Sequence, residues 1–482
     1  MEPIGRRQAL QLGVLGVAGV VVGSGGVFQA RTPTPHASGG ADLVEPSVLS
    51  SREGILRVEL EAAEREVVVA GRRATALSFN GQVPGPTLRL RPGDRLQVAM
   101  VNRLATPTNL HVHGLHVSPQ GNSDNPFIGI GPGERFDYEF QIPMDHPPGT
   151  YWYHPHRHGL VTDQVFGGLY GAIIIVGDPD IPSTRERLLV ISDITLDGAG
   201  RVGQAPMGAA MTGREGELVL VNGQLNPHLS ARPGERERWR VVNACTSRYL
   251  RLELPGQQVR LVGLDSDVLT RPLDVNEVLL APGNRADLLF TARPGTSALR
   301  TLGYDRGPGA MAMMGARRSP VSPVTLATLT VAGSTAPSLT DVPERGGSAD
   351  LRGQEPSRRR ELTLRAGMGA AMGAGMRFTI DGKEFDHRRT DQAVHAGATE
   401  EWTIRNTTPM DHPFHLHVWP MQVVEHAGVP LREPMWRDVV TIPAGGQSVV
   451  RIAFDDFTGR TVYHCHILDH EDAGMMGVVE VT

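Results

Sequence analysis

Residues 79–104 read FNGQVPGPTLRLRPGDRLQVAMVNRL, and this stretch recurs in altered form twice more along the chain. Apolar and polar residues alternate on either side of the Arg-Pro-Gly-Asp at 91–94. A two-residue period is that of a half-buried strand, and Pro-Gly pairs mark turns. The stretch therefore predicts two short strands joined by a tight turn.

The related stretches are VNGQLNPHLSARPGERERWRVVNA, 221–244, and IDGKEFDHRRTDQAVHAGATEEWTIRNTT, 380–408. Each begins at Asn-Gly or Asp-Gly and ends at or near an Asn. The repeats lie about 140–160 residues apart, which is a domain length rather than a solenoid period. Long helical patterns are absent, and 57 glycines and 36 prolines punctuate the chain. We predict an all-β protein of three Greek-key β-sandwich domains, at 51–178, 179–335 and 361–482, with a polar linker at 336–360.

The N-terminal residues 1–30 pair Arg6 and Arg7 with an apolar stretch, 9–22, that is too short to span a bilayer. This pattern predicts a twin-arginine signal peptide followed by a linker at 31–50, and an exported, periplasmic or extracellular protein. The alternative is an uncleaved anchor. We expect no membrane span in the mature chain. The net charge of −5 predicts no general attraction to nucleic acid.

Ten of the eighteen histidines fall in four short clusters, each containing His-x-His. The clusters are NLHVHG (His111, His113), YWYHPH (His154, His156), HPFHLH (His412, His415, His417) and HCHILDH (His464, His466, His470). Residues i and i+2 of a strand point to the same face, so each pair can direct two imidazoles at one point. We expect the other histidines, including His116 and His158, to be structural.

The clusters also match between the first and third domains. Superposing the motifs places His111/His113 on His415/His417, and His154/His156 on His464/His466, while the second domain has no such pair. We therefore predict a multinuclear metal cluster between domains 1 and 3. Eight neutral imidazoles suit copper, zinc, iron or nickel.

The same superposition shows what domain 3 has in addition. Pro155 stands opposite Cys465, and Thr108 opposite His412. Two imidazoles, a thiolate and a weak thioether form a blue-copper site, and Cys465, His412 and His470, with Met475 as the thioether, supply that set. Because Cys465 lies between His464 and His466, its side chain points to the opposite face of the strand.

Together these motifs resemble those of three-domain multicopper oxidases, most closely bacterial, thermophile-type laccases, which are related to copper-efflux cuprous oxidases. The resemblance runs from about residue 50 to 482 and implies cupredoxin-like domains with four copper ions. It implies a type 1 copper held by His412, Cys465, His470 and Met475, with Met476 as a rival for the axial position. It implies a type 2 copper held by His111 and His415, and a type 3 pair held by His113, His154, His156, His417, His464 and His466.

The resemblance also implies catalytic carboxylates that deliver protons while O2 is reduced to water. Glu471, directly after His470, resembles one such acid, and Asp124 in GNSDNP resembles the other. The alternatives are a surface charge for Glu471 and a turn-capping side chain for Asp124.

The electron donor is left open between two classes. A laccase oxidises phenols or aromatic amines, whereas a cuprous oxidase, acting in copper tolerance, oxidises Cu(I) bound by thioethers. Met410 and the methionines of 368–376 (Met368, Met372, Met376) suit the second class, although they also suit a filler role. Thr408 stands where the efflux oxidases have an acid, which weakens the cuprous interpretation. A non-enzymatic copper-sequestering protein is a further alternative, and we expect a monomer.

Overall fold

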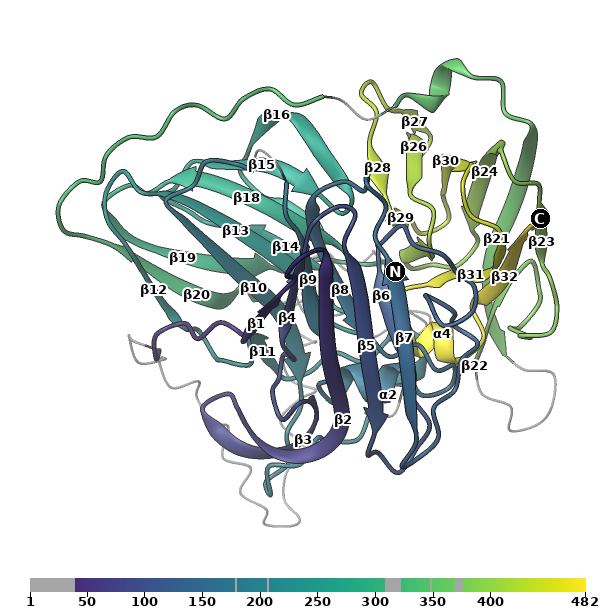
Figure 1. Cartoon of the computed structure of the whole chain (residues 1–482), viewed down its shortest axis with the longest axis horizontal. Coiled ribbons are helices and arrows are strands. Elements are labelled where there is room, and N and C mark those ends of the chain that lie inside the picture. The colour runs from purple at the N-terminus through teal and green to yellow at the C-terminus, as the bar shows by residue number, and fades with distance from the viewer. Residues whose placement is uncertain (1–39, 178–179, 206–207, 308–321, 347–348, 369–375) are drawn as a thin grey trace, which may run out of the picture. The chain divides into compact units, whose positions relative to one another are not determined.

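The computed structural model describes residues 40–177, 180–205, 208–307, 322–346, 349–368 and 376–482. The predicted signal peptide lies outside these residues. The described residues belong to one compact unit, in which three β-sandwiches follow one another along the chain (Figure 1). The predicted all-β fold is confirmed. No helix in the described ranges is long and apolar enough to cross a membrane.

The first sandwich extends from residue 48 to residue 175. One sheet has the order β1 (Val48–Ser50), β4 (Thr87–Leu90), β9 (Gly171–Ile175), β8 (Gly149–His154) and β6 (His111–His113). The other has the order β3 (Arg72–Phe79), β2 (Ile55–Val69), β5 (Arg95–Asn102) and β7 (Arg135–Gln141). Residues 48–50, which the sequence assigns to the N-terminal linker, pair in parallel with β4 and belong to the sandwich. A strand of three residues is too short to show an alternating pattern.

The second sandwich extends from residue 185 to residue 331. One sheet has the order β11 (Leu218–Val221), β10 (Arg185–Ile194), β13 (Arg236–Asn243), β18 (Arg285–Thr291), β15 (Val259–Leu264) and β16 (Asp267–Val275). The other has the order β12 (His228–Ala231), β20 (Val324–Val331), β19 (Gly295–Leu302), β14 (Leu250–Glu253) and β17 (Val278–Leu280).

The third sandwich extends from residue 358 to residue 481. One sheet has the order β22 (Met376–Ile380), β21 (Arg358–Met368), β24 (Ala398–Asn406), β30 (Gln447–Phe454), β26 (Met421–His426) and β27 (Val429–Pro430), and β28 (Trp436–Arg437) also pairs with β26. The other has the order β23 (Gln392–Val394), β32 (Met476–Val481), β31 (Gly459–Cys465), β25 (His412–Leu416) and β29 (Val439–Ile442). The predicted linker contains the 3-10 turn η2 (Leu351–Gly353).

The repeated stretch has the same structure in each domain. The strand before the Asn/Asp-Gly turn pairs antiparallel with a long strand (β3–β2, β11–β10, β22–β21), and the later strand pairs in parallel with that same strand (β5–β2, β13–β10, β24–β21). Both turn residues have positive φ in every copy, at 80–81, 222–223 and 381–382. Asn, Asp and Gly tolerate this conformation best, which explains why these residues recur.

The asparagine that closes each repeat also has one role in all three domains. Its carboxamide oxygen accepts the backbone N–H two residues later, and its nitrogen donates to backbone carbonyls of neighbouring segments, at Asn102, Asn243 and Asn406. A buried amide must be hydrogen-bonded, so this side chain fixes the path of the chain as it leaves the strand. In domains 1 and 3 that exit leads directly to the first histidine motif.

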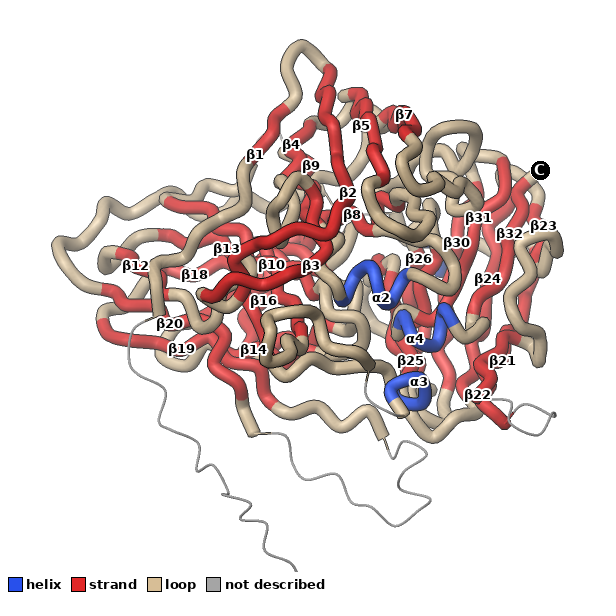
Figure 2. Tube along the Cα trace, turned by 90° about the horizontal axis from the view of Figure 1, so that it is seen from below, coloured by secondary structure: helices blue, strands red, loops and turns tan. Residues whose placement is uncertain are grey.

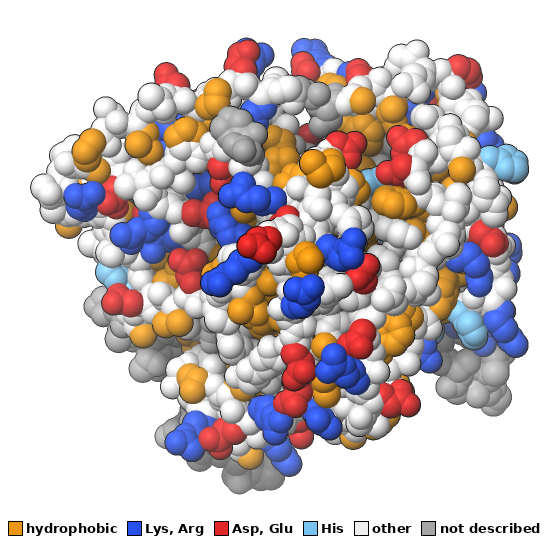
Figure 3. All heavy atoms as spheres, in the orientation of Figure 1, with side chains coloured by type: hydrophobic (Ala, Val, Ile, Leu, Met, Phe, Trp, Pro, Cys, Tyr) orange, Lys and Arg blue, Asp and Glu red, His pale blue; other side chains and the backbone are white. Residues whose placement is uncertain are grey.

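Short helices lie where domains meet rather than in the sandwich cores. α2 (Val161–Phe166) and α4 (Leu468–Asp472) pack against each other, and α3 (Ala209–Thr212) packs against α4 (Figure 2). Asp472 of α4 accepts hydrogen bonds from the backbone of Gly159, Val161 and Thr162, which fixes domain 3 to domain 1. On the face shown in Figure 3, basic and acidic side chains are interspersed, so neither sign dominates it.

Candidate metal centres

Each His-x-His pair begins on one of two pairs of strands, at facing edges of domains 1 and 3. His111 of β6 stands opposite His154 of β8, and His415 of β25 stands opposite His464 of β31. None of the eight imidazoles is more than 2% exposed. The alternation predicted from the sequence therefore directs all eight side chains away from their own cores.

The eight rings meet across the boundary between the two domains. The ring of His111 stacks on that of His417 with centroids 3.7 Å apart, and His113 stacks on His415 at 3.9 Å. The Nε2 atoms of His156 and His464 are 3.1 Å apart. Groups of three whose ligand atoms all lie within 4.8 Å of one another include His111/His113/His154, His111/His415/His417 and His156/His417/His464.

The electrostatics of this cluster favour a cation bound by neutral rings. Burial lowers the pKa of all eight histidines, and for His464 it lowers the pKa to about 4. For the other seven, the neighbouring imidazoles add to the effect of burial on the pKa. Ring nitrogens without a hydrogen-bond partner include Nε2 of His111, His154 and His415 and Nδ1 of His113 and His417. Buried polar atoms are normally paired, and neutral imidazole nitrogens are good ligands for copper. The residues present fit a copper cluster.

A second candidate centre lies on the other face of β31, within the core of domain 3. The Sγ of Cys465 is 3.3 Å from Nδ1 of His412 and 3.8 Å from Nδ1 of His470. Burial raises the pKa of the Cys465 thiol, so a thiolate forms here only together with a cation. Two imidazoles and a thiol with convergent ligand atoms fit a mononuclear copper site.

The two candidate methionines differ in where they pack. Met475 is fully buried in the same core cluster as Cys465 and Ile467. Met476 instead packs in a separate cluster with Val462 and Val478. Of the two thioethers, only that of Met475 lies on the Cys465 side of the sheet.

Glu471 lies beside the histidine cluster and is fully buried. Its Oε1 is 3.4 Å from Nε2 of His156, and its Oε2 is 3.1 Å from Nδ1 of His464. Burial raises the pKa of Glu471 to about 7, although the proximity of the His156 imidazole opposes the shift. A surface position for this carboxyl, the alternative left open by the sequence, is excluded.

Asp124 is also buried beside the cluster. Its Oδ1 lies 2.9 Å from Nδ1 of His111 and accepts the backbone N–H of Val112. Burial raises the pKa of Asp124 to about 8, and the Val112 N–H opposes the shift. The carboxylate therefore orients His111 with Nε2 towards the other rings.

The methionines singled out for Cu(I) are described only in part. Residues 369–375, with Met372, lie outside the described ranges, and Met376 is half-buried on β22. Met410 is buried in the domain 3 core. The hydroxyl oxygen of Thr408 lies 2.8 Å from Nε2 of His412, within hydrogen-bonding distance. Thr408 therefore contacts a candidate ligand directly.

Sequence reasoning missed several residues around the centres. Asp438 contacts His113 and His415 and is paired with Arg285 of domain 2. Arg214 of domain 2 pairs with Asp469 of α4. Except for Asp438 and His415, which are 23 residues apart, these partners are separated by more than a hundred residues in sequence, and none of the pairs forms a local motif. His116 and His158, expected to be structural, contact Asp456 and Phe385 respectively.

Comparisons with known proteins agree over most of the chain. Three family models described as multicopper oxidase match residues 61–180, 186–300 and 355–482. The chain is 27% identical to a multicopper oxidase of Staphylococcus epidermidis over 94% of this chain and 95% of the relative. It is 27% identical to a laccase of Bacillus subtilis over 84% of this chain and 90% of the relative.

A solved structure is similar over nearly the same length. The multicopper oxidase of Campylobacter jejuni, described as a metallo-oxidase, superposes with a TM-score of 0.80 and 31% identity. The match covers 92% of this chain and 95% of that one. The family models at 61–180 and 355–482 include all four histidine clusters.

Proposed function

This chain belongs to the multicopper oxidase family, and we propose that it acts as a laccase, coupling one-electron oxidation of phenols or aromatic amines to the reduction of O2 to water. One observation carries the proposal. Cys465 turns towards His412 and His470, while its neighbours His464 and His466 turn towards the histidines of domain 1. A single strand thus serves both centres.

We assign four copper ions to these residues. His412, Cys465, His470 and Met475 would hold the type 1 ion, and His111 with His415 the type 2 ion. The type 3 pair would be held by His113, His154, His156, His417, His464 and His466. Bound copper supplies one-electron oxidation of the donor at the first site and reduction of O2 at the cluster. The peptide links from Cys465 to its two neighbours provide a covalent path on the order of ten ångströms long.

Two carboxyl groups are suited to hold and deliver the protons that water formation consumes. Burial raises the pKa of Glu471 to about 7 and that of Asp124 to about 8, so both carry a proton over part of the neutral range. A proton donor is most effective when its pKa lies near the working pH. We assign Glu471 to the His156/His464 side of the cluster and Asp124 to the His111 side.

The experiment that tests the assignment uses the full chain loaded with copper. We expect a blue thiolate-to-copper absorption band, copper bound at both centres, and O2 uptake that depends on a phenolic donor. A chain that binds copper without consuming O2 would instead be a sequestering protein, and the laccase assignment would be abandoned.

A cuprous oxidase is the second candidate. It is favoured by the similarity to a protein described as a metallo-oxidase and by the buried Met410, two residues before His412 in the sequence. Turnover with Cu(I) and with a dimethoxyphenol should be compared in wild type, in Met410→Leu and in a triple Met→Leu variant at 368, 372 and 376. Leucine conserves volume but cannot bind Cu(I). Selective loss of Cu(I) turnover would favour the cuprous oxidase, whereas unchanged Cu(I) and phenol rates would favour the laccase.

Export by the twin-arginine route remains part of the proposal. Replacing Arg6 and Arg7 by lysines should retain the protein in the cytoplasm of a producing bacterium, as measured by cell fractionation. Unchanged export of that variant would point to a different route.

A further inference from the structure

Asp438, between β28 and β29, contacts one candidate copper ligand from each of two domains. Its carboxylate Oδ1 lies 3.1 Å from Nε2 of His113 in domain 1, and its backbone carbonyl lies 2.7 Å from Nδ1 of His415 in domain 3. The residue is 3% exposed. His113 and His415 stack on each other, so Asp438 lies at one edge of a stacked pair of rings.

These two contacts select opposite tautomers. An oxygen acceptor at Nε2 of His113 places the ring proton there and leaves Nδ1 with a free lone pair. An acceptor at Nδ1 of His415 leaves Nε2 free instead. The nitrogens freed in this way, Nδ1 of His113 and Nε2 of His415, are those that lack any hydrogen-bond partner. The second nitrogen of a metal-bound histidine normally donates to a carboxylate or carbonyl, which fixes its tautomer and orientation.

Arg285, the first residue of β18 in domain 2, holds Asp438 in place. Its two terminal nitrogens each lie 2.6 Å from a different oxygen of the Asp438 carboxylate. Its Nε donates to the carbonyl of Thr150 on β8 in domain 1, and the guanidinium is 1% exposed. The side chain therefore contacts all three domains, and its planar fork matches a carboxylate in a way that lysine cannot.

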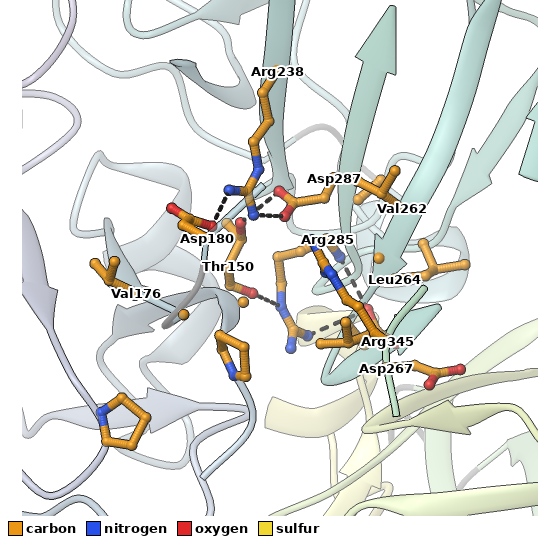
Figure 4. A pocket seen from close by; sticks show the side chains of 18 of the residues that line it. Thr150, Val176, Asp180, Arg238, Val262, Leu264, Asp267, Arg285, Asp287 and Arg345 are labelled. Carbon is orange, nitrogen blue, oxygen red and sulfur yellow. Dashed lines mark hydrogen bonds and ion pairs between the residues drawn. The ribbon is translucent and has the colours of Figure 1, made fainter. Parts of the chain in front are cut away.

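Asp438 is the carboxylate that Arg285 binds through both terminal nitrogens, and the neighbouring acids are paired otherwise or lie farther away. Asp287, two residues along the same strand, is paired with Arg238, as Figure 4 shows at the wall of a cavity of about 660 Å³. Figure 4 also shows Arg285 reaching Thr150 on the opposite wall. Asp265 is 3.4 Å from Arg285, a weaker contact than either bond to Asp438.

Two glycines with positive φ provide the space for this arrangement. A Cβ at Gly114, directly after His113, would lie 2.5 Å from a terminal nitrogen of Arg285 and 2.8 Å from Oδ2 of Asp438. A Cβ at Gly283 of domain 2 would lie 3.0 Å from both His113 and His466. Backbone from domains 1 and 2 thus approaches the same group of side chains as closely as glycine permits.

We propose that Asp438 and Arg285 are positioning residues of the trinuclear copper centre, through which domain 2, the domain without a copper ligand, fixes the tautomers and orientation of His113 and His415. The proposal rests on the proposed copper-oxidase function. Neither residue contacts the donor or O2; each acts through the two histidines.

The test measures how firmly cluster copper is held in the full-length, copper-loaded chain. In Arg285→Met, we expect cluster copper to be removed at a chelator concentration about 10- to 100-fold lower than in wild type, because loss of a ligand's hydrogen-bonding partner typically costs that much metal affinity. The blue band of the type 1 site serves as the internal reference and should persist. Arg285→Lys, which keeps the charge but not the fork, should lie between wild type and Arg285→Met.

Asp438→Asn separates the two contacts. The backbone carbonyl that contacts His415 remains, whereas the carboxylate that contacts His113 becomes a neutral amide. We therefore expect the type 3 absorption to change more than the type 2 paramagnetic resonance signal. Equal change in both signals, or none in either, would overturn the tautomer argument.

The matched control is Arg187→Met. Arg187 of β10 pairs with Glu237 through a buried bidentate contact in the same domain, with Nε 2.7 Å from Oε2, but it does not contact the copper ligands. If this variant lost cluster copper as readily as Arg285→Met, the effect would be general destabilisation, and the proposal would be rejected. If Arg285→Met does not fold, Arg285→Lys decides by the same comparison. A wild-type chain that binds no cluster copper would refute the proposed function itself.

Discussion

The histidine strands of domain 1 and domain 3 carry the same motif on one face and different chemistry on the other. β6 and β8, with His156 just beyond β8, present four imidazoles across the boundary, and so do β25 and β31 with the residues that follow them. On the opposite face, domain 3 brings Cys465 together with His412 and His470. Domain 1 has Pro155 and Thr108 at the corresponding positions, and the Thr108 hydroxyl donates to Gln164.

The difference shows how little must change to add a metal centre to a β-sandwich. Alternation keeps the two faces of a strand independent, so substitutions on the core face leave the boundary face intact. In domain 1 the core-facing polar group is satisfied by a hydrogen bond within the domain. In domain 3 the equivalent positions supply ligand atoms that converge on one point.

The largest expected effect tests whether the two faces are chemically distinct. Cys465→Ser should abolish the blue band and reduce donor oxidation to background, because a hydroxyl does not replace the thiolate of a blue-copper site. The type 2 signal should remain, since His464 and His466 keep their positions. Absorption and paramagnetic resonance spectra of the copper-loaded variant measure both.

The control for this substitution is Cys245→Ser. Cys245 is a buried thiol in the core of domain 2, with its Sγ 3.9 Å from the carbonyl oxygen of Ile191. This variant should stay blue. A blue Cys465→Ser variant would show that the type 1 assignment is wrong.

A smaller effect is expected from the acid that lies between the two domains. Glu471→Gln should lower the rate of O2 reduction by about 100-fold or more, the usual contribution of a positioned proton donor. The blue band should persist, because Glu471 faces His156 and His464 rather than Cys465. Rapid-mixing measurements can separate fast reduction by the donor from slow reoxidation by O2.

Glu480→Gln is the matched substitution. Glu480 lies on β32, the strand that pairs with β31. It accepts a hydrogen bond from Thr390, away from the copper ligands. Its reoxidation rate should equal that of wild type. Equal slowing in both variants would remove Glu471 from the proton pathway.

Asp124→Asn should weaken copper binding at the domain 1 side of the cluster. In wild type, Nδ1 of His111 and the N–H of Val112 share the two oxygens of the Asp124 carboxyl group. The amide of the variant offers them only one oxygen acceptor. We expect the type 2 copper to be lost at about 10- to 100-fold lower chelator concentration. The same substitution at Asp94, a buried turn residue that accepts the N–H of Arg91, is the control and should leave copper binding unchanged.

The smallest effect concerns a histidine that joins the same two domains without facing the cluster. His116 lies between Asp456 of domain 3, with Nε2 and Oδ2 2.6 Å apart, and the carbonyl of Val418. Burial alone lowers the pKa of His116, but Asp456 and the Val418 carbonyl outweigh it, so the pKa is raised. A raised pKa stabilises the fold below the unfolded value of about 6.5, and this contribution is lost as pH rises through the folded value.

We therefore expect Asp456→Asn to lower the melting temperature more at about pH 5 than at about pH 9. The Asp456 side chain is 44% exposed, so the pair contributes no more than about 1 kcal/mol. The measurement is thermal unfolding of both proteins at the two pH values. A difference in melting temperature between wild type and Asp456→Asn that is larger at high pH would contradict the assigned protonation of His116.

The fold could be predicted from local patterns to the extent that strands alternate and turns have characteristic residues. The Asn/Asp-Gly turns at 80–81, 222–223 and 381–382 and the strands beside them follow directly from such patterns. β1, with three residues paired in parallel to β4, could not be predicted, because so short a strand is specified by its partner rather than by its own sequence.

The candidate ligands lie in short motifs, and they could therefore be predicted from the sequence. The hydrogen-bonding partners of the ligands lie in no such motif. His113 and Asp438 are 325 residues apart, and Arg285 and Asp438 are 153 residues apart. The resemblance favoured Met475 over its rival Met476 as the axial thioether, but no local pattern gives a physical reason for that preference. The two residues are adjacent on the chain and pack in different clusters.

By itself, the sequence determined which residues can share a face, because the period of a strand and the conformation of a glycine turn depend on neighbours along the chain. Only the tertiary structure decided which faces meet. It stacked His111 on His417, buried Glu471 and Asp124 beside the rings, and brought Arg285 of domain 2 to Asp438. The physical reason is that desolvation and hydrogen-bond geometry depend on distances across domains, and these distances are set by packing rather than by any local pattern.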